Sequence, residues 1–135
     1  MTTATANTVV VPGGAVLRNL RDGLVYQLGL ASNEVGAATD LADPELHLVE
    51  PLARFDRVRS LLDELGGCES DKNVEVSGEH RWLIAEALHE ETGSLADLAR
   101  TAREEGHGDA ATRRRAERDA LIDYLIVLGV AGGDA

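Results

Sequence analysis

Apolar side chains recur at helical spacing near the start of the chain. Over residues 15–31, leucines occupy every third or fourth position, at Leu17, Leu20, Leu24 and Leu28. This spacing predicts an amphipathic helix. Asp22-Gly23, followed by alternating apolar residues over 24–30, permits a β-hairpin as the alternative. We favour the helix, because the leucine stripe holds over four turns and residues 15–20 do not alternate.

The middle of the chain contains the clearest single helix. Residues 32–50, which are rich in turn-forming residues, are predicted to form a connector with at most a short helical turn. Pro51 suits the first turn of a helix over residues 51–65, and Gly66-Gly67 end it. The predicted buried stripe of this helix consists of Leu52, Phe55, Val58, Leu61, Leu62 and Leu65.

Two short runs of β-branched residues lie on either side of this helical region. Thr8–Val11 is followed by Pro12-Gly13-Gly14, and Val74–Val76 follows a predicted loop. The two runs permit a small two-stranded ribbon, and the alternative for Thr8–Val11 is a simple extended arm. Such a ribbon is marginal alone, so it needs helices to pack against it.

Capping residues and glycine stops divide the C-terminal half into three predicted helices. Ser77 can cap the first, over residues 78–91, and Ser94 can cap the second, over residues 95–105. Thr92-Gly93 is predicted to separate them. The second helix is predicted to bury an apolar side made of Leu95, Leu98, Ala99 and Ala102.

The third of these helices is predicted to run from about residue 109 to residue 128, after a break at Gly106-His107-Gly108. It begins polar and becomes apolar nearly all round from Leu121 to Leu128. A helix end that is apolar on all sides must be covered, either by the rest of the domain or by another subunit.

Together these elements predict a mainly α fold. We expect an irregular bundle of four to five helices with at most a small two-stranded β element. Residues 1–12 are expected to form a flexible arm or short strand, residues 13–130 one helical domain, and residues 131–135 a disordered tail.

The composition narrows the function classes. The formal net charge is −11, and the acidic excess is spread evenly along the chain, so the overall field repels nucleic acid and anionic membranes. Residues 1–12 lack a signal-peptide pattern, and the longest apolar run is too short to span a bilayer. We therefore expect a cytoplasmic protein with no membrane partner. Cys68 is the only cysteine, which excludes an intrachain disulfide.

Two Glu-x-x-His spacings suggest a metal site of the kind found in di-iron helical bundles. They are Glu86 with His89 and Glu104 with His107. Gly106 interrupts the second pair, and the first pair faces away from the main apolar side of its helix. We therefore expect no metal and no cofactor, and keep a carboxylate–histidine metal-binding protein as an alternative.

Catalytic constellations are not evident in the sequence. His80 lies on the apolar side of its helix, where a partly buried, hydrogen-bonded histidine is the usual arrangement. Neighbouring carboxylates such as Asp63-Glu64 point in different directions, and no serine lies in a nucleophile elbow. We expect no catalytic residues and no enzymatic activity.

A second alternative is a transcriptional regulator. Residues 81–84 followed by residues 94–99 resemble the first helices of winged-helix regulators, in which a serine-capped helix precedes the recognition helix. The resemblance implies phosphate contacts by Arg113, Arg114, Arg115 and Arg118. The long connector over residues 106–111 and the lack of a β-wing pattern after Val130 oppose this alternative, so nucleic acid is not the partner we expect.

The sequence best fits an interaction or accessory protein that self-associates, most simply as a homodimer, with room for a further protein partner. Trp82 lies off the main apolar side of its helix, and interface cores favour tryptophan. The apolar end of the last helix points the same way. The expected interaction surface consists of Trp82, Leu121, Ile122, Tyr124, Leu125 and Ile126.

Overall fold

Four α-helices and a two-stranded ribbon make up the described part of the chain. The computed structural model describes residues 8–40, 44–66 and 71–129. The elements in chain order are β1 (Thr8–Val11), α2 (Ala15–Thr39), α3 (Pro44–Leu65), β2 (Val74–Ser77), the 3₁₀ helix η1 (Gly78–His80), α4 (Arg81–Glu104) and α5 (Gly108–Leu128). The predicted mainly α fold with a small β element is confirmed.

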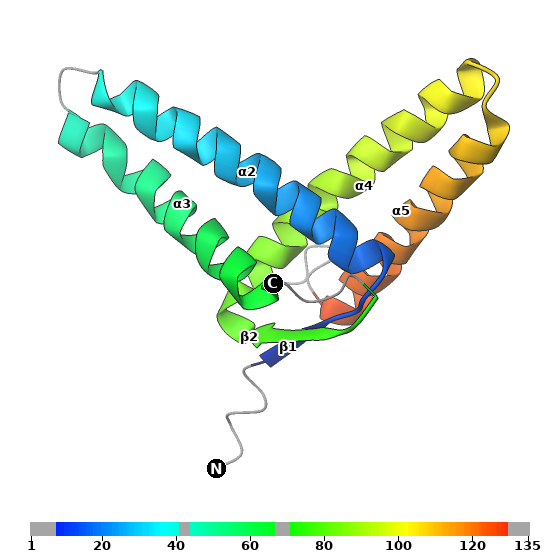
Figure 1. Cartoon of the computed structure of the whole chain (residues 1–135), viewed down its shortest axis with the longest axis horizontal. Coiled ribbons are helices and arrows are strands. Elements are labelled where there is room, and N and C mark those ends of the chain that lie inside the picture. The colour runs from blue at the N-terminus through cyan, green and yellow to red at the C-terminus, as the bar shows by residue number, and fades with distance from the viewer. Residues whose placement is uncertain (1–7, 41–43, 67–70, 130–135) are drawn as a thin grey trace, which may run out of the picture.

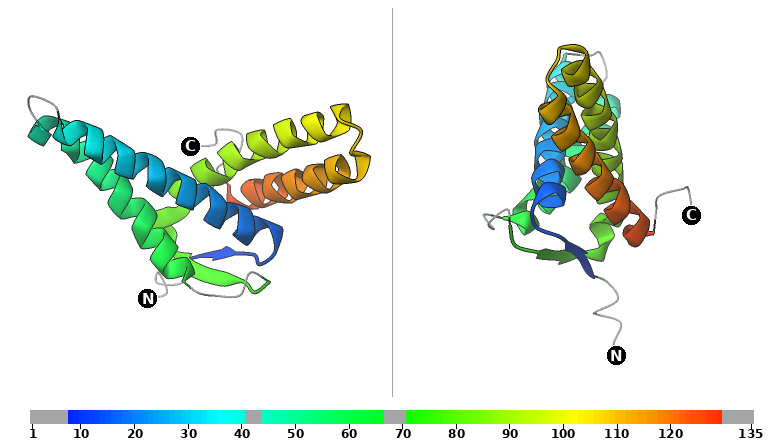
Figure 2. Two further views of the ribbon diagram at one scale, coloured as in Figure 1. Left: turned by 45° about the horizontal axis from the view of Figure 1, so that its top comes forward. Right: turned by 90° about the vertical axis from the view of Figure 1, so that its right-hand side faces the viewer.

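The helices form two antiparallel hairpins that diverge as the arms of a V (Figure 1). One arm is α2 with α3, and the other is α4 with α5. The strands β1 and β2 lie at the vertex, below the point where α2 crosses α4 (Figure 2). We call this end of the molecule the vertex and the opposite ends of the two hairpins the tips.

The strand pair that the sequence permits forms at the vertex. The strands are antiparallel, with Val9 opposite Val76 and Val11 opposite Val74. All four valines are buried, as the period of two in a strand requires when one face covers a core. Helix α5, near the other end of the sequence, also holds the ribbon in place. The hydroxyl of Tyr124 donates a hydrogen bond to the carbonyl of Val10 at 2.8 Å.

The core fills the vertex with side chains from all four helices. Leucine and isoleucine stripes of the helices meet there and pack against the ribbon. Among the largest fully buried side chains are Leu17, Leu20, Leu24, Leu61, Leu65, Ile84, Leu88 and Leu121.

Residues 15–31 are helical, as predicted, and the hairpin alternative is excluded. The helix is longer than expected, since α2 continues to Thr39. The predicted connector over residues 32–50 was therefore wrong. Ala31 and Ala38 continue the buried side of α2 along the arm. Alanine buries little apolar area, so a stripe built from it gives a weak signal in the sequence.

Helix α3 begins at Pro44, and Pro51 lies inside it rather than in its first turn. This adds nearly two turns to the predicted helix. Val58, Leu61 and Leu65 are fully buried as predicted, but Leu52 is 43% exposed. The vertex end of α3 faces the core, whereas Leu52 lies on the thin arm, where α2 alone covers α3.

Helix α4 replaces two predicted helices. Residues 81–104 are continuous, so Thr92-Gly93 does not end a helix and Ser94 does not cap one. The predicted cap at Ser77 is real but serves η1, where the Ser77 hydroxyl accepts a hydrogen bond from the Glu79 amide. The apolar stripe runs unbroken through Leu88 and Leu95 along α5, and this packing overrides the local stop signal.

The continuity of α4 has two consequences. Leu98, predicted to be buried, is 49% exposed, because the true buried side passes through Leu95 and Ala99. The helix-turn-helix on which the regulator alternative rested is not formed in residues 81–104. Gly106, at φ +85°, ends the segment instead, in the left-handed conformation that glycine adopts readily.

Helix α5 matches its prediction to within a residue and ends at Gly129, which has φ +85°. In the described part of the chain, no helix combines the length and the apolar character needed to cross a membrane. Cys68, the N-terminal arm through residue 7 and the predicted tail at 131–135 lie outside the described residues.

Candidate binding groove

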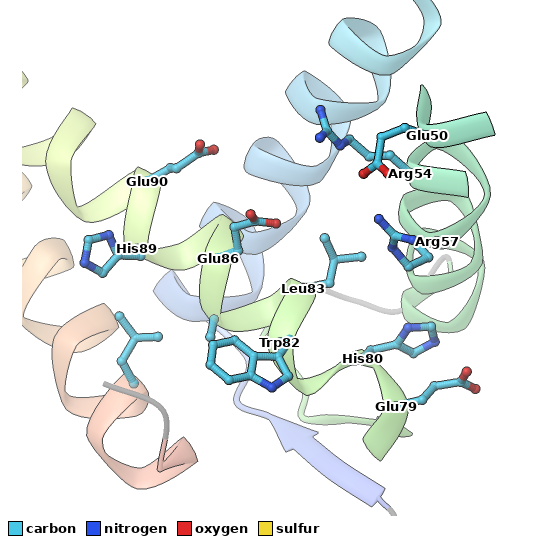
Figure 3. Close-up of a pocket in the computed structure, with 12 residues that line it drawn as sticks. Glu50, Arg54, Arg57, Glu79, His80, Trp82, Leu83, Glu86, His89 and Glu90 are labelled. Atoms are coloured by element: carbon cyan, nitrogen blue, oxygen red, sulfur yellow. The ribbon is translucent and has the colours of Figure 1, made fainter. Parts of the chain in front are cut away.

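A groove of about 570 Å³ extends from α3 across η1 and α4 to Leu125 of α5, on one broad side of the V (Figure 3). Its floor is apolar and is made by Trp82, Leu83, Ala85 and Leu125. Its rim is charged and is made by Glu50, Arg54 and Arg57 from α3, Glu79 and His80 from η1, and Glu86, His89 and Glu90 from α4. An apolar floor with a polar rim is typical of binding sites.

The walls of the groove carry opposite charges. Arg54 and Arg57 lie on the side of α3 that faces α4, where the carboxylates of Glu86 and Glu90 lie (Figure 3). Arg54 forms an ion pair with Glu34 of α2, in which Nη1 of Arg54 lies 3.3 Å from Oε1 of Glu34. Glu90 accepts a hydrogen bond from the side chain of Gln27 at 3.2 Å. Helix α2 therefore contacts side chains of both walls, one on α3 and one on α4.

Trp82 is the largest apolar side chain of the groove and is 65% exposed. It follows Arg81, whose guanidinium donates a hydrogen bond to the carbonyl of Leu128 at 2.6 Å. This bond joins the start of α4 to the end of α5. Trp82 therefore lies at the same end of the hairpin as Ile122 and Ile126, which are 38% and 64% exposed.

The remaining residues of the expected interaction surface lie inside the monomer. Leu121, Tyr124 and Leu125 belong to the core, with exposed fractions of 0%, 7% and 4%. Burial raises the pKa of the Tyr124 hydroxyl to about 12. Tyr124 and Leu121 hold α5 on the vertex, and only an edge of Leu125 reaches the groove. Of the six residues, Trp82, Ile122 and Ile126 are available to a partner.

A histidine–carboxylate cluster at the vertex was not foreseen as a unit. His80 is buried and its Nε2 lies 2.7 Å from Oε2 of Glu64 on α3. The other oxygen of Glu64 accepts a hydrogen bond from the Ser77 amide at 2.8 Å. The Ser77 amide, and after it the His80 side chain, hold the pKa of Glu64 below its usual value. The prediction of a buried, hydrogen-bonded His80 is confirmed.

The cluster also has the donors of a cation site. Ligand atoms of Glu64, Glu79 and His80 lie within 4.8 Å of one another. Two carboxylates and an imidazole are ligands that Zn²⁺ and Mn²⁺ accept. The hydrogen bonds already formed by Glu64 account for its position without an ion. The expected absence of a stoichiometric metal stays a prediction, and elemental analysis of purified protein tests it.

The two predicted Glu-x-x-His pairs are not brought together. Glu86 and His89 lie on the groove, whereas Glu104 ends α4 at the tip. Eighteen residues of helix separate Glu86 from Glu104, a rise of about 27 Å. The pair that does meet, Glu64 with His80, is separated by a loop and joins two elements. Helical spacing cannot reveal such a contact, since it depends on how α3 meets β2.

The arginines of α5 lie toward the tip and divide into two groups. Arg113 and Arg114 are exposed, and Arg114 pairs with Glu117 at 3.5 Å. Arg115 and Arg118 instead line a small hollow together with Arg100 and Arg103 of α4. The sequence did not predict this second group, because the partners of Arg115 and Arg118 come from a different helix.

Comparison with protein-family models, with curated proteins and with solved structures finds no match to this chain. The fold and the groove define a V-shaped helical protein with an open, amphipathic groove.

Proposed function

We propose that the protein is a non-enzymatic interaction protein that self-associates through the broad side of the α4–α5 hairpin. The single observation that carries this proposal is the exposure of Trp82 and Ile126, which are 65% and 64% exposed. An exposed tryptophan at the same end of a helical hairpin as exposed isoleucines is typical of a protein–protein contact.

The position of α5 supports the proposal. Tyr124 and Leu128 face the vertex and are buried, so the monomer covers one side of the helix. Ile122 and Ile126 are one turn apart on another side, next to the groove-facing edge of Leu125. Because α5 lies at the outside of the fold, no other described element covers these two isoleucines fully. Exposed apolar side chains that form one contiguous patch normally mark an interface, which is the arrangement that the proposal requires.

The proposal gives His80 a structural role. Among the histidines that line the groove, His80 is the buried one, and Glu64 occupies its Nε2 at 2.7 Å. An imidazole held in this way positions η1 against α3. The groove then serves as a shaped surface with a fixed charge pattern.

Sedimentation velocity over a wide concentration range tests the proposal. Wild-type protein is expected to shift from monomer to dimer as its concentration rises, and Ile126→Glu is expected to stay monomeric. Val127→Glu is the matched control, because Val127 is the adjacent residue, is 81% exposed and lies on a different side of α5. Unchanged melting temperatures would show that both variants fold.

Trp82 gives an independent readout, because it is the only tryptophan of the chain. Burial of its indole in an interface should move the fluorescence emission to shorter wavelength as the dimer forms. A wild type that stays monomeric at every concentration, with unchanged emission, contradicts the proposal.

A further inference from the structure

The hollow near the tip of the α4–α5 hairpin, which we call the arginine hollow, has an unusual lining. It measures about 170 Å³ and is formed by Ala96, Ala99, Arg100, Arg103, Arg115 and Arg118. Four arginines from two helices therefore line one hollow in a chain whose net charge is −11. Like charges held this close favour an anionic partner between or above them.

Neighbouring carboxylates neutralise only part of this charge. Asp97 lies 3.2 Å from Arg100, and Asp119 lies 3.4 Å from Arg118. The described residues place no ion-pair partner within 4.0 Å of Arg103 or Arg115. The Nε of Arg118 is buried without a hydrogen-bond partner among the described residues. The arginines of the hollow thus have N–H groups that can donate hydrogen bonds to further acceptors.

The groove at the vertex has the opposite charge. Four carboxylates line it, against the two guanidinium groups of Arg54 and Arg57. Arg54 is already engaged by Glu34, so the groove has an acidic excess. Trp82 adds an exposed aromatic face, and a guanidinium stacks favourably on such a face. The groove and the arginine hollow are therefore complementary in charge and chemistry.

Both features lie on the same side of α4. Trp82, His89, Ala96 and Arg103 follow one another at intervals of seven residues, which is close to two helical turns. The first two line the groove and the last two line the arginine hollow. One face of one helix thus carries an acidic half and a basic half.

Gly93 lies at the middle of this face. A Cβ added to Gly93 would meet nothing within 4 Å, so the helix surface is open at this point. Glu86 and Arg100 lie seven residues on either side of it. A two-fold axis passing beside Gly93 would place Arg100 of one copy over Glu86 of the other, twice in each dimer. The lack of a side chain at Gly93 allows the two α4 helices to approach closely at the axis.

We infer that the groove of each protomer is occupied by a second copy of this chain, packed antiparallel across α4 so that the arginine hollow of one copy covers the acidic groove of the other. The inference rests on the proposed self-association and names its geometry. Long-range repulsion between two chains of net charge −11 is largely screened at physiological ionic strength, where the Debye length is about 8 Å. The contacts between hollow and groove act at shorter range.

A charge-swap series tests the arrangement. Glu86→Arg places two cationic groups together at both symmetric contacts, and Arg100→Glu places two anionic groups there. Each single variant is expected to weaken the dimer by about tenfold or more. The double variant Glu86→Arg/Arg100→Glu pairs opposite charges again and is expected to recover most of the wild-type affinity. Both residues are exposed, so the fold should be unaffected.

Two controls carry the same charge changes outside the two features. Asp56→Arg on α3 and Arg113→Glu on α5 lie at exposed positions that line neither the groove nor the hollow. Dimer dissociation constants for all variants are measured by sedimentation, and both controls are expected to stay near the wild-type value. A general charge effect would shift the two single variants in opposite directions and would act equally on the two controls. Loss of affinity in both single variants, with recovery in the double variant and unchanged controls, therefore identifies the specific contact.

The outcomes separate this inference from the proposed function. A dimer that Ile126→Glu disrupts and that every charge variant leaves unchanged overturns the antiparallel geometry, while the proposed function stands. A wild type that never dimerises overturns both. Salt-sensitive binding of duplex DNA that Arg100→Glu abolishes without changing the dimer would assign the arginine hollow to nucleic acid and also overturn the inference.

Discussion

The vertex and the tips of the V are stabilised in different ways. At the vertex, four helices and the ribbon bury large side chains such as Leu20, Leu61 and Ile84. Toward the tips each arm is only two helices thick, and the buried positions are mainly small, such as Ala38 on α2 and Ala111 on α5. A thin arm has few large side chains to bury, because solvent lies on most sides of each helix.

This difference explains where the fold is strong and where a partner fits. Buried area provides most of the stability of a small domain, so the vertex should dominate the free energy of unfolding. The arms leave groove and helix faces open instead. Apolar and charged side chains displayed there are available for contacts with another molecule. Substitutions at the vertex should therefore cost more stability than substitutions on the arms.

Leu61→Ala should be the most damaging change. Leu61 is fully buried at the vertex, and truncation of such a leucine costs about 2–5 kcal/mol of stability. Leu52→Ala, on the arm of the same helix, should cost less than about 1 kcal/mol, because Leu52 is already 43% exposed. Urea unfolding of both variants measures the difference. Equal losses would show that the arm is as tightly packed as the vertex.

His80→Leu should have the next largest effect. It leaves a similar volume in place but removes the partner of Glu64, and loss of one partner of a buried hydrogen bond costs about 1–3 kcal/mol. His89→Leu, on the exposed groove, is the matched control and should change stability by less than about 0.5 kcal/mol. If His80→Leu leaves the free energy of unfolding unchanged, the stability of the vertex does not depend on this pair.

Acidification sharpens the test of the same pair. The pKa of Glu64 is lower in the folded protein than its ordinary value of 4.5, so the folded state favours the ionised carboxylate. The stabilisation is fully present above pH 4.5 and is lost as the pH falls through the folded-state pKa. His80→Leu should show a smaller loss over this range, because only the Ser77 amide then favours the ionised form. An unchanged pH profile would contradict the role of His80.

The sequence predicted the vertex better than the arms. Large apolar residues at regular spacing, such as Leu17 and Leu20, give a signal that depends only on the helix period. The paired strands and the buried His80 followed from similar local patterns. On the arms, the sequence pattern wrongly predicts a connector over residues 32–50 and a break at Gly93, since alanine stripes and exposed glycines resemble loops. The groove depends on the angle between hairpins, and the cluster of Glu64 with His80 depends on a contact between separate elements. No local pattern records either of these.

Gly93→Ala should stabilise the protein by about 0.5–1 kcal/mol, because glycine inside a helix costs about that much relative to alanine. The added Cβ would meet nothing within 4 Å. Ser94→Ala should be nearly neutral or slightly stabilising, whereas loss of an N-cap serine would cost about 1 kcal/mol. Thermal melts at low protein concentration measure both. Destabilisation by both variants would restore the predicted break and shorten the α4–α5 arm.

The smallest expected effect concerns Glu91. This residue lies where α2 crosses α4, between the vertex and the arms. Burial, and then the neighbouring charges of Asp22 and Glu90, raise the pKa of Glu91 above its ordinary value of 4.5. The folded state therefore holds this proton more tightly than the unfolded state. Ionised Glu91 lowers stability at neutral pH, and that loss is relieved as the pH falls through the raised pKa.

Glu91→Gln removes this ionisation and should raise the melting temperature at pH 7. The gain should be small, a few tenths of a kcal/mol, because Glu91 is only partly buried and solvent screens much of the repulsion. It should disappear below about pH 4.5, where wild-type Glu91 is itself protonated. Asp56→Asn, exposed on α3, controls for the loss of one negative charge. If Glu91→Gln gains nothing beyond Asp56→Asn, or keeps its gain in acid, the crossing of α2 and α4 is as open to water as the tips.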